Sequence, residues 1–306
     1  MYRLFLYFFL IILVVFGKAY GIENKILFKI DNKIITSIDI SNEINYLTSL
    51  NKNILELENE KIFEIAKNSL IKEKMKEIEL LKVVKEIDIN ETDFNNLILP
   101  LYIKNGINSI DELKQYFILN TIDIKVVKRK IAINAIWNQM IYQKFSQNLN
   151  INREEIRKDL LQNDKQKEFL LSEILFELKE NEKVSEKFEL IKNTINEKGF
   201  IDAALIYSIS DTSKTGGELG WVKEKSINPK IMKKVLSLNE GEFSNPITLP
   251  GGFLILKVNQ IRESSIELDI ENEIEKVVKG KINAQLNQFS NIYLNKIRKD
   301  IVINEL

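Results

Sequence analysis

The chain of 306 residues contains no cysteine and no histidine. Without cysteine it forms no disulfide and holds no thiolate nucleophile, Cys-ligated zinc or iron–sulfur cluster. Without histidine it has no Ser-His-Asp relay, no His-metal site and no imidazole general base. These two absences exclude most hydrolase and metalloenzyme mechanisms, and we expect neither a metal nor a cofactor.

Neither sign of charge is in excess, since lysine plus arginine and aspartate plus glutamate both total 44. The first 21 residues contain Arg3, Lys18 and no acid, so the rest has 42 basic against 44 acidic residues, a net charge of −2. A nucleic-acid binder normally has a basic excess on one domain, so we expect no nucleic-acid partner. The glycines at 216, 217 and 220 lack phosphate-loop spacing and indicate a tight turn with close backbone packing, so we expect no nucleotide.

The longest apolar run, Leu4–Phe16, has 13 residues, whereas a membrane-spanning helix needs roughly 17–25. Arg3 precedes the run, and the small residues Ala19 and Gly21 follow it. This pattern is typical of a secretory signal peptide over residues 1–21, cleaved near Gly21. The alternative is a retained membrane anchor.

Glycine and proline are scarce outside one part of the chain. Seven of the 11 glycines and three of the four prolines lie between Gly199 and Gly252. Because both residues interrupt regular structure, we expect a helical segment over 22–163, a compact α/β segment over 164–263 and a helical segment over 264–306. We expect the helix Ile270–Ile297 to return to the first segment, and Ile301–Ile303 to add a strand there. The alternative is an independent C-terminal helix.

Local patterns predict how the first segment begins. Ile26–Ile30 and Ile34–Ile35 indicate two short strands joined by a turn. Thr36 followed by Asp39 is a capping pattern that opens a helix.

Local patterns also predict elements of the compact segment. The apolar run Phe169–Phe176 suits a central strand, and Gly199 ends the expected helix Val184–Lys198. We expect Glu242–Ser244 and Gly252–Val258 to form a hairpin through the intervening turn.

The compact segment resembles a parvulin-type peptidyl-prolyl isomerase domain. The matching residues occur in the family's order and spacing: Ser172-Glu173-Ile174-Leu175, Ala204, Tyr207-Ser208, Ser213-Lys214, Gly216-Gly217-Glu218-Leu219-Gly220-Trp221, Leu238, Gly241-Glu242, Ser244, Pro246-Ile247 and Gly252 to Val258. The resemblance implies an α/β domain with a small antiparallel sheet.

The flanking segments resemble the SurA-type periplasmic chaperones. The resemblance rests on three stretches: Ile30 to Thr36 with Asp39, Asn105-Gly106 with Asp111-Glu112-Leu113, and Leu294 through Ile303. It implies a discontinuous, mostly helical chaperone domain, so that the whole chain has an α+β fold. It also implies a periplasmic location and unfolded exported or outer-membrane polypeptides as clients, with the outer-membrane assembly machinery as a further candidate partner.

The resemblance breaks at the catalytic positions. The parvulin resemblance implies that active members of the family have two histidines beneath a slot for proline, with a Cys or Asp nearby. Here the first position is Glu173, the second is Leu254 and the third is Ser210, with Asp211 one residue later. The candidate substrate-binding residues, at or beside the slot, are Leu219, Ile227, Ile231 and Trp221.

A buried polar network loses its hydrogen bonds when its members become an acid and an aliphatic residue. We therefore assign no catalytic residue and expect weak or absent isomerase activity. Two alternatives stay open: neighbouring residues compensate for the missing imidazoles, or Glu173 is a solvent-facing acid with no role. The leading interpretation is a passive holdase of the SurA type. The other functions are an active prolyl isomerase and a membrane-anchored folding factor resembling PpiD.

Overall fold

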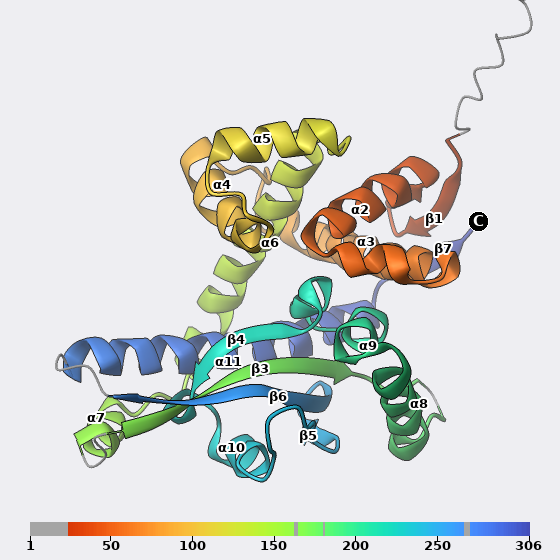
Figure 1. The fold of residues 1–306 in the computed structure, drawn as a ribbon. Helices are drawn as coiled ribbons and strands as arrows, with labels where there is room; N and C mark the ends of the chain where they lie inside the picture. The colour runs from red at the N-terminus through yellow and green to blue at the C-terminus, as the bar shows by residue number, and fades with distance from the viewer. Residues whose placement is uncertain (1–23, 162–164, 180, 266–269) are drawn as a thin grey trace, which may run out of the picture.

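The protein has an α+β fold of two sheets and long helices, as expected (Figure 1). The structure, a computed structural model, describes residues 24–161, 165–179, 181–265 and 270–306. The expected signal peptide over residues 1–21 lies outside these ranges. Among the helices described, none is both long and apolar enough to cross a membrane.

A small sheet joins the two ends of the described chain. Strand β1 (Ile26–Ile30) pairs antiparallel with both β2 (Lys33–Thr36) and β7 (Ile303–Glu305), in the order β2-β1-β7. Thr36 caps the helix that follows, because its hydroxyl accepts from the Asp39 backbone N–H while the Asp39 carboxylate accepts from the Thr36 N–H.

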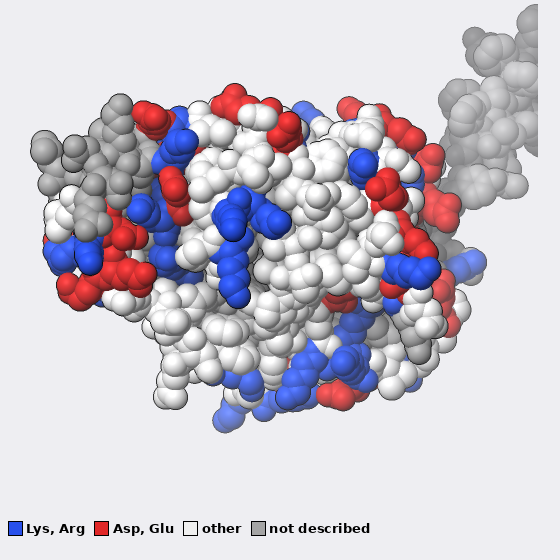
Figure 2. All heavy atoms as spheres, turned by 90° about the horizontal axis from the view of Figure 1, so that it is seen from below, with Lys and Arg blue, Asp and Glu red and all other residues white. Residues whose placement is uncertain are grey.

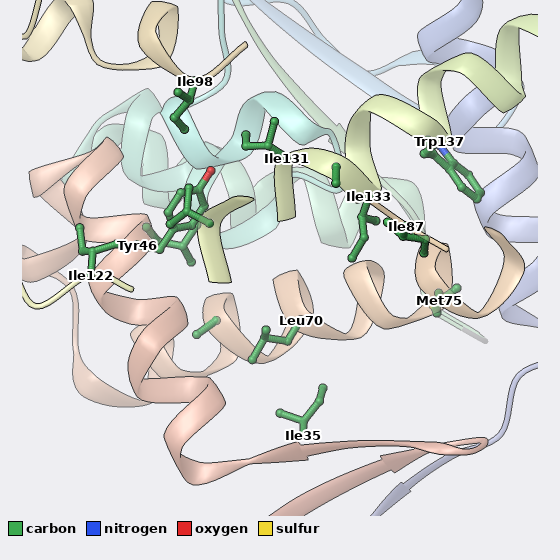
Figure 3. Packing of buried hydrophobic residues seen from close by; sticks show 14 of the residues in the cluster. Ile35, Tyr46, Leu70, Met75, Ile87, Ile98, Ile122, Ile131, Ile133 and Trp137 are labelled. Carbon is green, nitrogen blue, oxygen red and sulfur yellow. The ribbon is translucent and has the colours of Figure 1, made fainter. Parts of the chain in front are cut away.

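The helical region holds the largest core. Its elements are α2 (Ser37–Leu50), η1 (Lys52–Glu56), α3 (Asn59–Leu80), α4 (Glu91–Ile98), η2 (Leu99–Leu101), η3 (Ile103–Asn105), α5 (Ile110–Leu119), α6 (Ile124–Phe145), η4 (Ser146–Asn148), α7 (Arg153–Leu161) and α11 (Ile270–Arg298). Figure 3 shows the buried side chains of α2, α3 and α6, among them Leu70 and Ile131, facing one another. Tyr293, Leu294 and Ile297 of α11 join this core, so the N-terminal and C-terminal segments pack together.

The second sheet lies between two groups of helices. Its strands β3 (Lys165–Phe176), β4 (Glu218–Lys223), β5 (Ile247–Leu249) and β6 (Gly252–Ser265) pair antiparallel in the order β4-β3-β6-β5. The remaining elements are α8 (Val184–Lys198), α9 (Phe200–Tyr207), η5 (Asp211–Thr215), η6 (Glu224–Ser226) and α10 (Pro229–Val235).

Side-chain alternation along β3 gives this sheet two apolar faces. Ile174 and Phe176 point to one face and pack against α8 and α9. Leu171 and Leu175 point to the other face, which α10 covers with Met232.

The sequence-based hairpin needs a correction. The turn before β6 is confirmed, but the strand that leads into it is β5. The segment Glu242–Ser244 pairs with β6 through one isolated bridge, between Phe243 and Lys257, and the backbone hydrogen bonds beside it, and it forms no strand of its own. Pro246 lies between this bridge and β5, and a proline has no N–H to continue the ladder.

A buried ion cluster ties three helices of the core together. The Lys130 ammonium on α6 lies 2.7 Å from a Glu43 carboxylate oxygen on α2, and it also pairs with Glu73 on α3. Burial alone would lower the pKa of Lys130, but the two carboxylates reverse that effect and raise it. Burial likewise opposes the charge of Glu43, and Lys130 keeps the pKa of Glu43 below its usual range. The charges of Lys130 and Glu43 therefore stabilise each other.

We expect Lys130→Met to lower the free energy of unfolding by about 3–5 kcal/mol, because it leaves two carboxylates unpaired in the core. Urea denaturation measures the change. The matched control is Lys125→Met at an exposed position of the same helix, for which we expect a change of at most about 0.5 kcal/mol. The triple variant Lys130→Met, Glu43→Gln, Glu73→Gln should recover much of the lost stability. Equal stability of the Lys130 and Lys125 variants would contradict the assignment.

Candidate functional site

The structure brings Glu173 and Ser210 together, although 37 positions separate them in the chain. The Ser210 hydroxyl donates a hydrogen bond of 2.6 Å to Glu173 Oε1. The Thr212 hydroxyl donates to the same oxygen at 2.9 Å and lies 3.1 Å from Ser210 Oγ. Glu173 is thus held by two hydroxyls and does not face solvent, contrary to one alternative from the sequence, while a role for it stays a prediction.

The backbone fixes this arrangement. Glu173 N donates to the Gly217 carbonyl at 2.7 Å, which brings the end of the loop against β3. Gly217 has φ of +80°, and a Cβ on it would lie 2.2 Å from the Glu173 carbonyl oxygen. Only glycine fits there, so the expected tight turn with close backbone packing is confirmed.

The Glu173 carboxyl lies on the α10 side of the sheet. Along β3, Glu173 alternates with Leu171 and Leu175, and it pairs in register with Leu256 of β6. All three leucines belong to the cluster that α10 covers. Burial in this apolar setting raises the pKa of Glu173. The hydrogen bonds from Ser210 and Thr212 work in the opposite direction, and the Asp211 carboxylate adds to the rise.

Leu254 also lies on the α10 side of the sheet. It pairs in register with Leu175 and is buried in the cluster that α10 covers. Ile227 and Ile231 pack against that cluster and remain partly exposed. Three of the predicted positions therefore form a continuous apolar surface beside Glu173.

Two other predicted residues lie apart from this surface. Leu219 is 36% exposed and Trp221 is 37% exposed, and neither belongs to the α10 cluster. Trp221 pairs with Leu170, whose neighbours in β3 face α10, so Trp221 points to the opposite side of the sheet. There the centre of its ring lies 4.0 Å from the guanidinium carbon of Arg262, and Arg262 pairs with Glu168.

Sequence reasoning missed Thr212 and made no prediction about where the Asp211 side chain points. Asp211 turns away from Glu173, and its carboxylate lies 3.1 Å from the Lys76 ammonium of α3. Lys76 lowers the pKa of Asp211 well below its usual range. The Lys72 ammonium, also on α3, donates to the Ile209 carbonyl. The serine and threonine content of the loop was the one available signal for Thr212.

The side chains at this site can contact a ligand only through apolar surface and hydrogen bonds. Within the ranges that the structure describes, no group of three acidic side chains is placed to hold a metal ion. The site presents one partly buried carboxyl beside the apolar residues Leu254, Ile227 and Ile231.

Comparison with known proteins identifies the domain that contains Glu173. Residues 169–260 match the Rotamase family, described as the PPIC-type PPIASE domain. The chain therefore contains one domain of that family.

A little over half of the chain is similar to curated SurA chaperones. It is 23% identical to Chaperone SurA of Pseudomonas putida over 193 residues, which cover 58% of this chain and 44% of that protein. It is 26% identical to Chaperone SurA of Pectobacterium atrosepticum over 204 residues, which cover 55% and 46% of the two chains. The chain is thus SurA-like with one parvulin domain, and the matches span less than half the length of these relatives.

The alignment with one solved structure extends over most of the chain. That structure is described as "The virulence factor PEB4 and the periplasmic protein Cj1289 are two structurally related SurA-like chaperones in the human pathogen Campylobacter jejuni". It is 16% identical, with a TM-score of 0.37, and the alignment covers 92% of this chain and 99% of that one.

We expect Glu173→Gln to make the protein more stable at pH 7, because it removes a buried charge and keeps an acceptor for both hydroxyls. The pKa of the Glu173 carboxyl is higher in the folded protein than in the unfolded chain. Such a carboxyl contributes fully to the free energy of unfolding only while it is protonated, and this contribution is lost as pH rises through the folded-state pKa. The difference from wild type should therefore shrink as pH falls toward about 4. Urea denaturation at a series of pH values measures this difference in the free energy of unfolding.

Glu197→Gln, at an exposed position of α8, is the control and should leave the pH dependence of the free energy of unfolding unchanged. A destabilising effect of Glu173→Gln at pH 7 would show that the charge itself is required.

Proposed function

We propose that this protein is a periplasmic holdase that binds unfolded exported polypeptides, outer-membrane proteins among them, and that its parvulin domain has little or no isomerase activity. The proposal of little or no isomerase activity rests on the hydrogen bonding of Glu173. Its carboxyl is held by Ser210 and Thr212 in place of an imidazole pair.

Rotation about an X-Pro bond must cross a barrier of about 18–20 kcal/mol without covalent chemistry. A catalyst needs an apolar seat for the proline ring and polar groups that favour the twisted amide over the planar one. Leu254, Ile227 and Ile231 supply the apolar seat. Leu254 offers no polar group, and the Glu173 oxygen already accepts two hydrogen bonds. This supports retained binding with weak turnover.

The surface supports binding of many sequences. Large apolar side chains are exposed on the part of the helical region that contains α4 and α5, including Ile103, Ile118 and Leu119. Ile118 is 77% exposed and Leu119 is 83% exposed. Seen from the side of α10, the molecule presents a broad uncharged area interrupted by one group of basic side chains (Figure 2). A holdase needs shallow surface of this kind, because unfolded chains expose apolar segments that aggregate.

The names of the relatives agree with this proposal. Both of the curated proteins reported above are named as SurA chaperones, and the resemblance of the flanking segments is to the periplasmic chaperones of that type. We infer the same compartment for this chain after removal of residues 1–21. The outer-membrane assembly machinery is a further proposed partner.

A paired assay tests the function with one preparation of the chain from Ile22 onward. We expect it to suppress aggregation of a urea-denatured porin on dilution. We expect cis/trans exchange of a short X-Pro peptide to stay near the uncatalysed rate, on the scale of tens to hundreds of seconds. Rapid exchange together with unhindered porin precipitation would establish the isomerase alternative instead.

A second prediction places client binding on the α5 surface. Ile118→Ser with Leu119→Ser should raise the protein concentration needed to suppress porin aggregation several-fold, because the pair contributes apolar contact area. Leu55→Ser, at a 64% exposed position on η1, is the control and should leave the concentration unchanged. Equal performance of both variants would remove this surface from the proposal. Circular dichroism confirms that each variant is folded.

A further inference from the structure

A cavity of about 1160 Å³ lies between the helical region and the parvulin domain. Its wall includes residues of α3, residues of α9 and η5, and residues near the C-terminal end of α11. The loop with Ser210 and Asp211 forms part of this wall, whereas Glu173 does not line it. The cavity is therefore a separate feature from the proline slot.

The lining of this cavity has an excess of positive charge that the whole chain lacks. It contains seven basic side chains and four acidic ones, whereas the whole chain has equal numbers. Three of the acids are already paired: Asp211 with Lys76, Glu73 with Lys130 and Glu64 with Lys67. In the part of the chain that the structure describes, five of the basic residues make no ion pair: Lys72, Lys179, Lys214, Arg298 and Lys299.

Two of these lysines lie inside the cavity and not at its rim. Lys72 and Lys214 are only partly exposed, and the one hydrogen bond of the Lys72 ammonium goes to the Ile209 carbonyl. Burial lowers the pKa of Lys72 to about 8, and burial also lowers the pKa of Lys214. An anion placed beside them would offset the cost of burying both charges.

The cavity also contains a group that requires a hydrogen-bond donor. Glu177 Oε1 is buried and has no hydrogen-bond partner among the described residues. A polypeptide satisfies both requirements, because its backbone N–H groups donate and its carboxylates pair with lysine. Leu178, Ile206 and Leu294 in the same lining add apolar contacts.

We propose that this cavity binds acidic segments of unfolded polypeptides, with Lys72 and Lys214 holding their carboxylates. This inference rests on the proposed holdase function and gives it a preference for one class of client segment. The apolar α5 surface and the cavity then have different tasks, one for apolar side chains and one for anionic ones.

The test compares two fluorescent peptides that share one apolar sequence. In one peptide the polar positions are Asp and Glu, and in the other they are Asn and Gln. With the chain from Ile22 onward, anisotropy titration should show about five- to tenfold tighter binding of the acidic peptide at low salt. That preference should shrink as ionic strength rises from about 0.05 to about 0.3 M. Equal affinity for the two peptides would overturn the proposal.

Variants locate the site. The double variant Lys72→Gln, Lys214→Gln should lose the preference and keep its affinity for the uncharged peptide. The control Lys233→Gln, Lys234→Gln removes the same charge from exposed positions of α10 and should keep the preference. A preference that survives in the cavity variant, or disappears in the control, would place the anion site elsewhere.

The same assays distinguish binding of small anions, and failure of the holdase function itself, from the proposed preference for acidic segments. Inorganic phosphate should weaken acidic-peptide binding no more than chloride does at equal ionic strength, and a larger effect would assign the cavity to small anions. If neither peptide binds and porin aggregation is not suppressed, the holdase function fails together with this inference. If porin aggregation is suppressed and the peptides bind equally, only the preference fails.

Discussion

One short loop contacts the sheet of the parvulin domain and a helix of the helical region at the same time. Ser210 and Thr212 donate to Glu173 in the sheet, while Asp211 between them pairs with Lys76 on α3. Successive side chains of this loop therefore face opposite directions. The loop therefore links α3 to the surroundings of Glu173, and Leu205 of α9, which is buried in the helical core, adds a second contact between the two regions.

These contacts explain how the site exists without histidine. An imidazole pair can exchange hydrogen bonds within a buried network, whereas a carboxylate can only accept them. Ser210 and Thr212 supply the donors that Glu173 accepts from, and Leu254 adds apolar surface beside it. On the proposed assignment, Leu254 stands where the family has its second polar member. The site then has few groups that could stabilise a twisted amide, which is the basis of the proposed weak activity.

Most of the secondary structure could be predicted from the sequence because its signals are local. The helix Val184–Lys198 has the predicted bounds because Gly199 follows it with φ of +92°. The cap at Thr36 was predictable because both of its hydrogen bonds span three residues. Glu173 and Ser210 could be predicted as neighbours only through the parvulin resemblance, since no local pattern relates them.

The remaining features could not be predicted, because they depend on contacts between distant segments. Lys76 and Asp211 are 135 positions apart, and nothing in the surroundings of either residue marks it as half of an ion pair. The orientation of Trp221 depends on the register of β4 against β3, which includes an irregularity between Leu171 and Ser172. A shift of one residue moves a side chain to the other face of a sheet. Trp221 was therefore a reasonable candidate from the sequence. The register of β4 places its side chain on the other side of the sheet.

The electrostatics connect the helical region to the slot through the same loop. Lys76 keeps Asp211 ionised, and the Asp211 carboxylate contributes to the raised pKa of Glu173. A charge on α3 therefore influences the protonation of a carboxyl in the sheet through one intermediate residue. If an anion bound next to Lys72 and Lys214, it would add negative potential close to Asp211 and weaken the hold of the lysines on it. The cavity and the surroundings of Glu173 differ in their residues and in the ligands that suit them, but Ser210 lines the cavity and also contacts Glu173.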